Sequence, residues 1–211
     1  IRKELGWEPK QPLRIGMEYP SPNTNKPLHV GHLRNITLGE SVSKIIGFCG
    51  DKPIHLNLFN DRGILISKSM AGYERYGENK TPESEKIQGD FFVGKYYVLF
   101  SKESAEKPEL EEIAEEKLRK WESGDKETLL LWKKMNSWAY SGMQKTFNKF
   151  GLSKIDKTYY ESDIYLNGKE IIEEGLKRGL FKKREDGAIF IDLKEDGLDE
   201  KVLLRPDGTA V

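Results

Sequence analysis

Two histidines bracket a glycine at His29, Gly31 and His32, and these residue types at this spacing suit phosphate chemistry. They follow a loop rich in proline and asparagine and precede an apolar-periodic stretch, so they lie where a helix should begin. The amides of a first helical turn have no intrahelical acceptor and form a ready anion site. Two imidazoles three residues apart share one side of such a turn and can both donate to an oligophosphate. The segment predicts a site where charge builds up on a phosphate during a reaction.

Two other interpretations of the histidine pair stay open on the residues alone. A His-x-x-His pair can be half of a metal site, and His55 with Cys49 would complete four zinc ligands. Cys49 stands at an expected helix end and His55 in an expected strand, which argues against their convergence. The histidines can also be ordinary polar residues that cap a helix, because short motifs often match by chance. We expect no metal site.

The elements that must position the histidines form one strand-helix-strand unit. Residues 13–19 alternate apolar and polar side chains and predict a strand, whereas the three prolines of residues 20–27 exclude a helix. A helix is expected over about 28–48 and a second strand over 53–59. Such a unit pairs its strands in parallel. The apolar stripe that we expect this helix to bury consists of Leu38, Val42, Ile45 and Ile46.

The rest of the chain is expected to be mainly helical before it turns to short strands. A turn at 60–63 leads into a helix over 64–76. Further helices are expected over 91–100, 108–121 and 127–150. The elements expected after them are a strand over 157–161, a helix over 168–178, a hairpin of 181–184 with 188–193, and a strand over 201–204.

We divide the chain into three parts on this basis. Residues 1–76 hold the strand-helix-strand unit and the helix after it, residues 77–180 form a mainly helical insertion, and residues 181–211 hold short strands. The fold class is α/β with a parallel sheet. The chain opens at Ile1 rather than at a methionine, so we expect a trimmed segment of a longer protein.

Composition excludes several classes of protein. Lys and Arg together number 35, as do Asp and Glu, so gross charge alone does not direct the 211-residue chain to nucleic acid or to an anionic membrane. No apolar run approaches 18 residues, so no membrane partner is expected. The single cysteine excludes an internal disulfide and a multi-cysteine zinc site, which fits the cytoplasm.

One long segment resembles a known family. Residues 18–34, Glu-Tyr-Pro-Ser-Pro-Asn-Thr-Asn-Lys-Pro-Leu-His-Val-Gly-His-Leu-Arg, closely resemble the signature of class I arginyl-tRNA synthetases, in which the His-x-Gly-His element binds ATP. Residues 60–63 resemble the family's Asp-x-Gly turn, residues 160–162 its strand after the insertion, and residues 204–209 its Arg-x-Asp-Gly-Thr stretch. The resemblance implies a partial Rossmann-like, HUP-type nucleotide-binding catalytic domain. Residues 1–76 would be its first half, residues 77–180 a mainly helical connective insertion, and residues 181–211 truncated strands that return toward the catalytic domain.

The resemblance implies roles for the residues around the first loop. His29, Gly31 and His32 would hold ATP and stabilise the pentacovalent phosphate. Lys26 would replace the second lysine of the family's Lys-Met-Ser-Lys-Ser loop, although it can also be a solvated loop lysine. The residues that would contact arginine are Glu18, Ser21 and Asn23. Glu18 can instead form a salt bridge at the end of the sheet.

Two further stretches match positions that border the amino-acid pocket of the family. Asp61 and Gly63 lie in the first, where Gly63 is expected to have a positive φ and Asp61 can simply cap the following helix. The second consists of Asp207, Gly208 and Thr209, although Asp-Gly is also a common turn pair. Lysines of the long insertion helix and of the hairpin either touch the end of the tRNA or form a solvated face.

The function implied is ATP-dependent activation of arginine, with Mg²⁺ accompanying ATP and no structural zinc, and transfer to tRNA(Arg) by a cytoplasmic monomer. The alternative is a stand-alone nucleotide-binding module or a small adenylyltransferase of the same superfamily. The insertion of about a hundred residues argues against this alternative, since small adenylyltransferases need no such element. Because much of the family's enzyme is absent from 211 residues, we expect the isolated chain to be weakly active or inactive.

Overall fold

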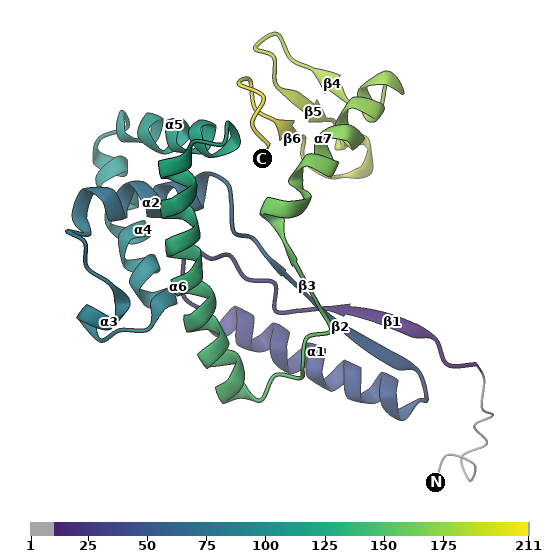
Figure 1. Ribbon diagram of the computed structural model, residues 1–211. Helices are drawn as coiled ribbons and strands as arrows, with labels where there is room; N and C mark the ends of the chain where they lie inside the picture. Colours follow the sequence, from purple (N-terminus) through teal and green to yellow (C-terminus); the bar gives the residue numbers. More distant parts are fainter. Residues whose placement is uncertain (1–10, 211) are drawn as a thin grey trace.

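The computed structural model describes residues 11–210, and its centre is a three-stranded parallel sheet. β1 (Arg14–Glu18) pairs with β2 (Lys52–Phe59), which pairs in turn with β3 (Lys157–Tyr160). All three strands end at the same edge of the sheet, where ligands usually bind in parallel sheets. The predicted strand-helix-strand unit is confirmed, with α1 (Val30–Phe48) as its connection (Figure 1).

α1 begins where the proline-rich loop ends, but it buries a different face from the one we predicted. Its buried residues are Ile36, Gly39 and Ser43. The predicted stripe lies outside instead, with Leu38 50% exposed and Ile45 61% exposed. The physical reason is the small side of the helix at Gly39, where an added Cβ would lie 2.3 Å from the Tyr19 ring. The face of α1 that carries Gly39 can therefore approach the Tyr19 ring closely, and this is the face that is buried.

The insertion is a helical bundle in which α2 also takes part. Its helices are α2 (Ile64–Tyr76), α3 (Pro82–Glu85), α4 (Gly89–Glu106), α5 (Leu110–Glu122) and α6 (Lys126–Phe150). The core consists of Ile66, Met70 and Tyr73 of α2, Phe92, Val93 and Tyr96 of α4, and Met135 and Ala139 of α6. The helices predicted over 64–76, 108–121 and 127–150 are confirmed within two residues at each end, and α2 packs with the insertion (Figure 1). α4 runs six residues beyond the expected end at 100, and α3 was not predicted.

After the bundle the chain returns to the parallel sheet as β3 and continues directly into α7 (Glu161–Lys177). The sheet therefore takes its third strand from within residues 77–180, which we had assigned to the insertion. α7 also begins seven residues before the expected start at 168. The Asp61 carboxylate accepts the Ser162 amide at 2.9 Å and starts the helix, a contact between residues 101 apart that local periodicity does not reveal.

The last part of the described chain forms a second, antiparallel sheet. β4 (Lys182–Lys183), β5 (Ile189–Ile191) and β6 (Lys201–Leu204) pair in that order, with a short 3₁₀ helix over Lys194–Asp196. The predicted hairpin is confirmed, and Gly187 in its turn has a φ of 95°. Among the described residues these strands pair with one another and not with the parallel sheet, and their return toward the catalytic domain stays a prediction. The domain boundaries stay a prediction.

None of the described helices has the length and the apolar composition that crossing a bilayer requires.

Candidate functional site

The two histidines at the start of α1 hold each other in place through the backbone. His29 is the N-cap residue, and its Nδ1 accepts the amide of Gly31 at 3.1 Å. The Nδ1 of His32 accepts the amide of His29, also at 3.1 Å, and the ring centroids lie 4.1 Å apart. A neutral imidazole that accepts at Nδ1 carries its proton on Nε2. Both rings thus keep an Nε2–H that can donate to a ligand. Each histidine can therefore bind the backbone and a ligand at the same time.

The local environment keeps His32 neutral. Partial burial lowers its pKa, and the nearby His29 and Lys26 lower it further. Gly31 is needed between the rings, because a Cβ at this position would lie 2.9 Å from the His29 ring. The pair lines a cavity of about 310 Å³ together with Thr146 and Phe150 of α6.

Lys26 lies in the loop that leads to this cavity. The loop is seated on α4 at Gly94, where an added Cβ would lie 2.6 Å from Pro27 Cδ and 3.4 Å from Lys26 Cα. Lys26 is half-buried, and its charge acts on the imidazole of His32. The structure therefore brings together the lysine and the two histidines that we predicted for phosphate binding.

The three residues predicted to contact arginine lie at the same edge of the sheet in different settings. Glu18, the last residue of β1, is exposed and lines a cavity of about 260 Å³. Within residues 11–210 it forms no salt bridge, contrary to the alternative that we considered. Ser21 has a φ of 47°, and its Oγ accepts the amide of Leu58 at 3.1 Å. Asn23 forms an isolated parallel bridge with Asn60.

Asp61 does not cap α2, since no side chain caps that helix and Gly63 is its N-cap residue. The Asp61 side chain points inward and is 1% exposed. One carboxylate oxygen accepts the Ser162 amide, and the other accepts the hydroxyls of Ser162 at 2.8 Å and Tyr140 at 2.9 Å. Burial raises the pKa of Asp61, while these hydrogen bonds act in the opposite direction. Asp61 is thus an internal clamp rather than a pocket edge.

Gly63 has a φ of 92°, so the expected positive angle is confirmed. It lines a cavity of about 440 Å³ together with Asn23. The turn at 206–209 is also confirmed. Asp207 Oδ1 accepts the amide of Thr209 at 3.0 Å and its hydroxyl at 2.8 Å, while Gly208 has a φ of 81°. Neither Asp207 nor Gly208 lines that cavity, whereas Arg205 does.

Sequence reasoning missed the charged cluster that supports this edge. The Arg62 side chain is 1% exposed and pairs with Glu122 at 2.5 Å and with Glu161 at 3.5 Å. Its guanidinium also lies 4.1 Å from the centre of the Tyr165 ring. Burial raises the pKa of Glu161, and the charge of Arg62 opposes the rise. A single arginine inside an Asp-x-Gly turn was the signal for this cluster, since arginine at such a buried position requires carboxylate partners.

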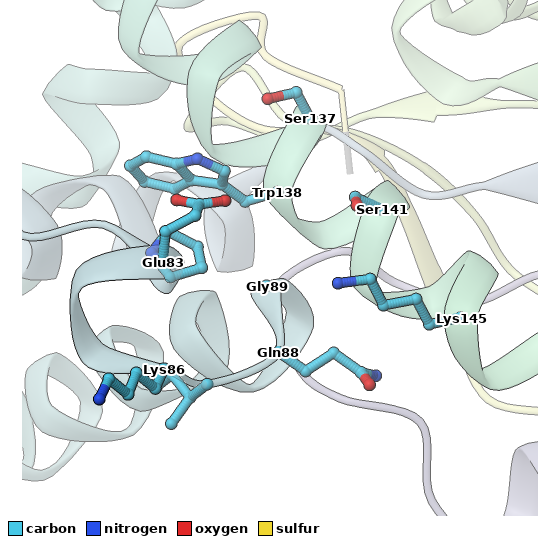
Figure 2. Close-up of a pocket in the computed structure, with 10 residues that line it drawn as sticks. Glu83, Lys86, Gln88, Gly89, Ser137, Trp138, Ser141 and Lys145 are labelled. Atoms are coloured by element: carbon cyan, nitrogen blue, oxygen red, sulfur yellow. The ribbon is translucent and has the colours of Figure 1, made fainter.

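A further cavity lies in the insertion, between α3, the start of α4, and α6. Its volume is about 530 Å³, and it contains Lys145, one of the lysines that we considered for contact with RNA. Figure 2 shows the Lys145 side chain reaching toward the first residue of α4, Gly89, below Ser141. The other labelled charges are Glu83 and Lys86 on the α3 side. None of the residues predicted for ATP or arginine lines this cavity.

The four residues of the zinc alternative do not come together in the described chain. His29 precedes α1 and Cys49 follows it, so the helix of 19 residues separates them by about 28 Å. Among residues 11–210, no group of three or more His, Cys, Asp or Glu side chains could hold a metal ion.

Comparison with known proteins gives this arrangement a family. The family model for class I tRNA synthetases (R), catalytic domain, matches residues 3–211. The chain belongs to this family. It is 54% identical over 200 residues to an arginine–tRNA ligase of Treponema denticola and 47% identical over 226 residues to one of Amoebophilus asiaticus. It covers 34% and 38% of these relatives, while they cover 94% and 99% of it. The chain thus spans about a third of the relatives' length.

Solved structures agree with this membership. Thermus thermophilus arginyl-tRNA synthetase superimposes with a TM-score of 0.66 and 26% identity over 99% of this chain and 36% of its own. The Plasmodium falciparum arginyl-tRNA synthetase gives a TM-score of 0.64 at 20% identity, over 93% of this chain and 32% of its own. At that identity the second match supports the fold alone. The predicted α/β class with a parallel, Rossmann-like sheet is confirmed.

Proposed function

We propose that the protein of which this chain is part is an arginine–tRNA ligase. It activates arginine with ATP, releases pyrophosphate, and passes the arginyl group to tRNA(Arg). The observation that carries the proposal is the pair of imidazoles at the start of α1, each fixed through Nδ1 and each presenting Nε2–H. Family membership supports the choice of reaction.

The first step joins a carboxylate oxygen of arginine to the α-phosphorus of ATP and breaks the bond from that phosphorus to pyrophosphate. Negative charge grows on the phosphate oxygens, and His29 and His32 donate Nε2–H to them without changing their own protonation. The ammonium group of Lys26 stabilises the departing pyrophosphate. Mg²⁺ enters with ATP, and no residue becomes covalently attached to the substrate.

Arginine binds at the same edge of the sheet in this proposal. The Glu18 carboxylate pairs with the guanidinium fork of the substrate, and Ser21 and Asn23 receive its ammonium and carboxylate groups. Ser21 suits this role because its Oγ accepts a sheet amide while its hydroxyl hydrogen can still be donated. Gly63 borders the pocket, and the turn at Asp207, Gly208 and Thr209 is joined to its wall through Arg205, which donates to the Thr209 hydroxyl.

The partners of the whole protein are tRNA(Arg), arginine and ATP, and we propose a monomer in the cytoplasm. A small adenylyltransferase remains the second candidate, since the same histidine site can move AMP to other acceptors. The helical bundle between β2 and β3 favours the ligase, because it provides a surface for tRNA in addition to the edge of the sheet.

The experiment is aminoacylation by the full-length protein with ATP and tRNA(Arg), using arginine, lysine and citrulline in parallel. Arginine alone should be attached to the tRNA. Transfer of AMP to another acceptor without arginyl-tRNA formation would contradict the ligase assignment. The 211-residue chain should be weak or inactive in the same assay, because three parallel strands are fewer than an open nucleotide-binding sheet needs.

A further inference from the structure

Asn57 is a buried polar residue on β2, the central strand of the parallel sheet. Its side chain is 2% exposed. His55 and Phe59 share its face of the strand, and Phe59 packs in an apolar cluster with residues of α1 and α6. An amide in such surroundings is costly unless it is hydrogen-bonded. The partner of Asn57 therefore indicates why a polar residue stands here, and none of the roles proposed above includes it.

The side chain of Asn57 holds Ser21 of the proline-rich loop. Asn57 Oδ1 accepts the Ser21 amide at 3.1 Å, between residues 36 positions apart. The amide of the next residue, Leu58, donates to Ser21 Oγ, also at 3.1 Å. Two successive residues of β2 thus hold Ser21 at both its amide and its hydroxyl oxygen. Neither bond uses the hydroxyl hydrogen of Ser21, which can still be donated to a ligand.

The backbone of Ser21 requires this support. Its φ of 47° lies in the left-handed region, which residues with a Cβ rarely adopt. Without a hydrogen bond to its amide, Ser21 would favour a negative φ, and its Cβ and hydroxyl would then point in another direction. The direction of the Ser21 hydroxyl therefore depends on the acceptor that Asn57 provides.

The other hydrogen bonds that join the loop to this part of the sheet use backbone atoms on the sheet side. The Asn60 amide donates to the Pro22 carbonyl at 3.1 Å, and the Asn60 carbonyl accepts the Thr24 amide at 3.1 Å. Among the described residues, Asn57 is the only one of 52–60 whose side chain forms a hydrogen bond with residues 20–25. It is thus the position of β2 at which a substitution removes one of these bonds directly.

We propose that Asn57 is a positioning residue for the amino-acid substrate. It does not touch arginine, but it fixes Ser21 in the left-handed conformation in which the Ser21 hydroxyl meets the polar groups at the α-carbon of arginine. The inference rests on the proposed function, because it takes arginine as the ligand of Ser21. The phosphate contacts come from His29 and His32, so loss of Asn57 affects the binding of arginine more than that of ATP.

The test is steady-state aminoacylation of tRNA(Arg) by the full-length protein, with the KM values for arginine and for ATP measured separately. Asn57→Ala and Asn57→Leu both remove the acceptor, and leucine fills nearly the same volume, so the pair separates the hydrogen bond from packing. Both variants should raise the KM for arginine by about five- to tenfold, the effect of losing one hydrogen bond. The KM for ATP should change by less than about twofold.

Ser21→Ala shows whether Asn57 acts through Ser21. This variant lacks the hydroxyl, so adding Asn57→Ala to it should raise the KM for arginine no further. A second rise of about five- to tenfold in the double variant would overturn the proposal, because Asn57 would then act independently of Ser21. A merely structural role of Asn57 would change the melting temperature without this coupling.

Asn148→Ala is the matched control. Asn148 lines the same cavity of about 450 Å³ as Asn57, and its Oδ1 also accepts a hydrogen bond, but from Gln144 of α6 at 2.9 Å. This variant should keep the wild-type KM for arginine. The proposal is overturned if both Asn57 variants keep that value too, or if the KM for ATP rises as much as the KM for arginine. Failure of the wild type to form arginyl-tRNA refutes the proposed function itself, whereas an unchanged KM in an active enzyme refutes only the role of Asn57.

Discussion

At the scale of single residues, each imidazole does two things at its two nitrogens. Nδ1 accepts a backbone amide of the helix start, which fixes the ring, and Nε2–H stays available for a phosphate. Protonation would end the first role, because a protonated Nδ1 cannot accept. Capping and the proposed donation to phosphate therefore require the same neutral form of His32, and its lowered pKa supplies that form at neutral pH.

The pKa of His32 gives a prediction with a definite sign. A histidine whose pKa in the folded state is below its unfolded value stabilises the fold fully above the unfolded pKa of about 6.5. This contribution is lost as the pH falls from there toward the lower folded value. Carbon-13 NMR of labelled histidines should give His32 a midpoint below that of the denatured protein. A midpoint above it would contradict the geometry of the cap.

The residues of the site differ in how far the sequence reveals them. His29, His32 and Gly63 were predictable, because their residue types and spacing are typical of a helix start and of a turn that needs a positive φ. Asp61 and Arg62 were not, because their partners lie 60 to 101 residues away in α5, α6 and α7. A local pattern shows that a charge is present but not which buried group will neutralise it.

At the scale of elements, α1 is positioned by contact at a glycine rather than by its apolar stripe. Tyr19 precedes the proline-rich loop, and its ring lies against Gly39 while its hydroxyl donates to Glu40 at 3.1 Å. Glu40 also accepts the amide of Ser153 at 2.7 Å. The helix that presents the histidines is therefore joined both to β1 and to the segment that leads into β3.

Gly39→Ala tests this contact against helix propensity. Alanine favours a helix over glycine by about 1 kcal/mol, yet its Cβ would meet the Tyr19 ring, so we expect a net loss of about 1–3 kcal/mol in stability. Gly47→Ala in the same helix has open space at its Cβ and should be neutral or stabilising. Urea unfolding of both variants measures the difference. Equal effects would show that α1 is not held at Gly39.

Periodicity located the elements better than it located their faces and ends. The parallel strands and the helices of the bundle follow from local patterns in the chain. The buried face of α1 and the start of α7 do not, since a bulky ring at Tyr19 and a distant carboxylate at Asp61 decide them.

At the scale of the whole molecule, Asp61 joins the sheet to the bundle. Its carboxylate holds α7 and Tyr140 of α6, and its backbone carbonyl accepts the Trp132 indole at 2.6 Å and the Asn136 amide at 3.1 Å. Asp61, which follows β2, is thereby joined to the residues that follow β3 and to α6 between the two strands. Movement of the bundle would therefore be transmitted to the carboxyl edge of the sheet, where the cavity lined by Asn23 and Gly63 lies.

Asp61→Ala should disrupt this connection. It leaves the Ser162 amide and two hydroxyls without their acceptor, and we expect a loss of about 2–3 kcal/mol in stability. Asp163→Ala, an exposed change in the first turn of α7, should remain within about 0.5 kcal/mol of the wild type. Urea unfolding followed by tryptophan fluorescence compares them. If the two variants unfold alike, Asp61 is not the clamp.

The rate of arginine-dependent pyrophosphate exchange in two substitutions of His32 tests the central claim most directly. In the full-length protein, with tRNA(Arg) present, the oxygen of His32→Asn can replace Nδ1 and keep the cap, but this variant has no group at Nε2. The nitrogen of His32→Gln can replace Nε2. Asparagine should therefore lower kcat by about 10²–10³-fold at an unchanged melting temperature, and glutamine should retain more activity. Equal losses in the two variants, or full activity with asparagine, would contradict a role for Nε2–H at the phosphate.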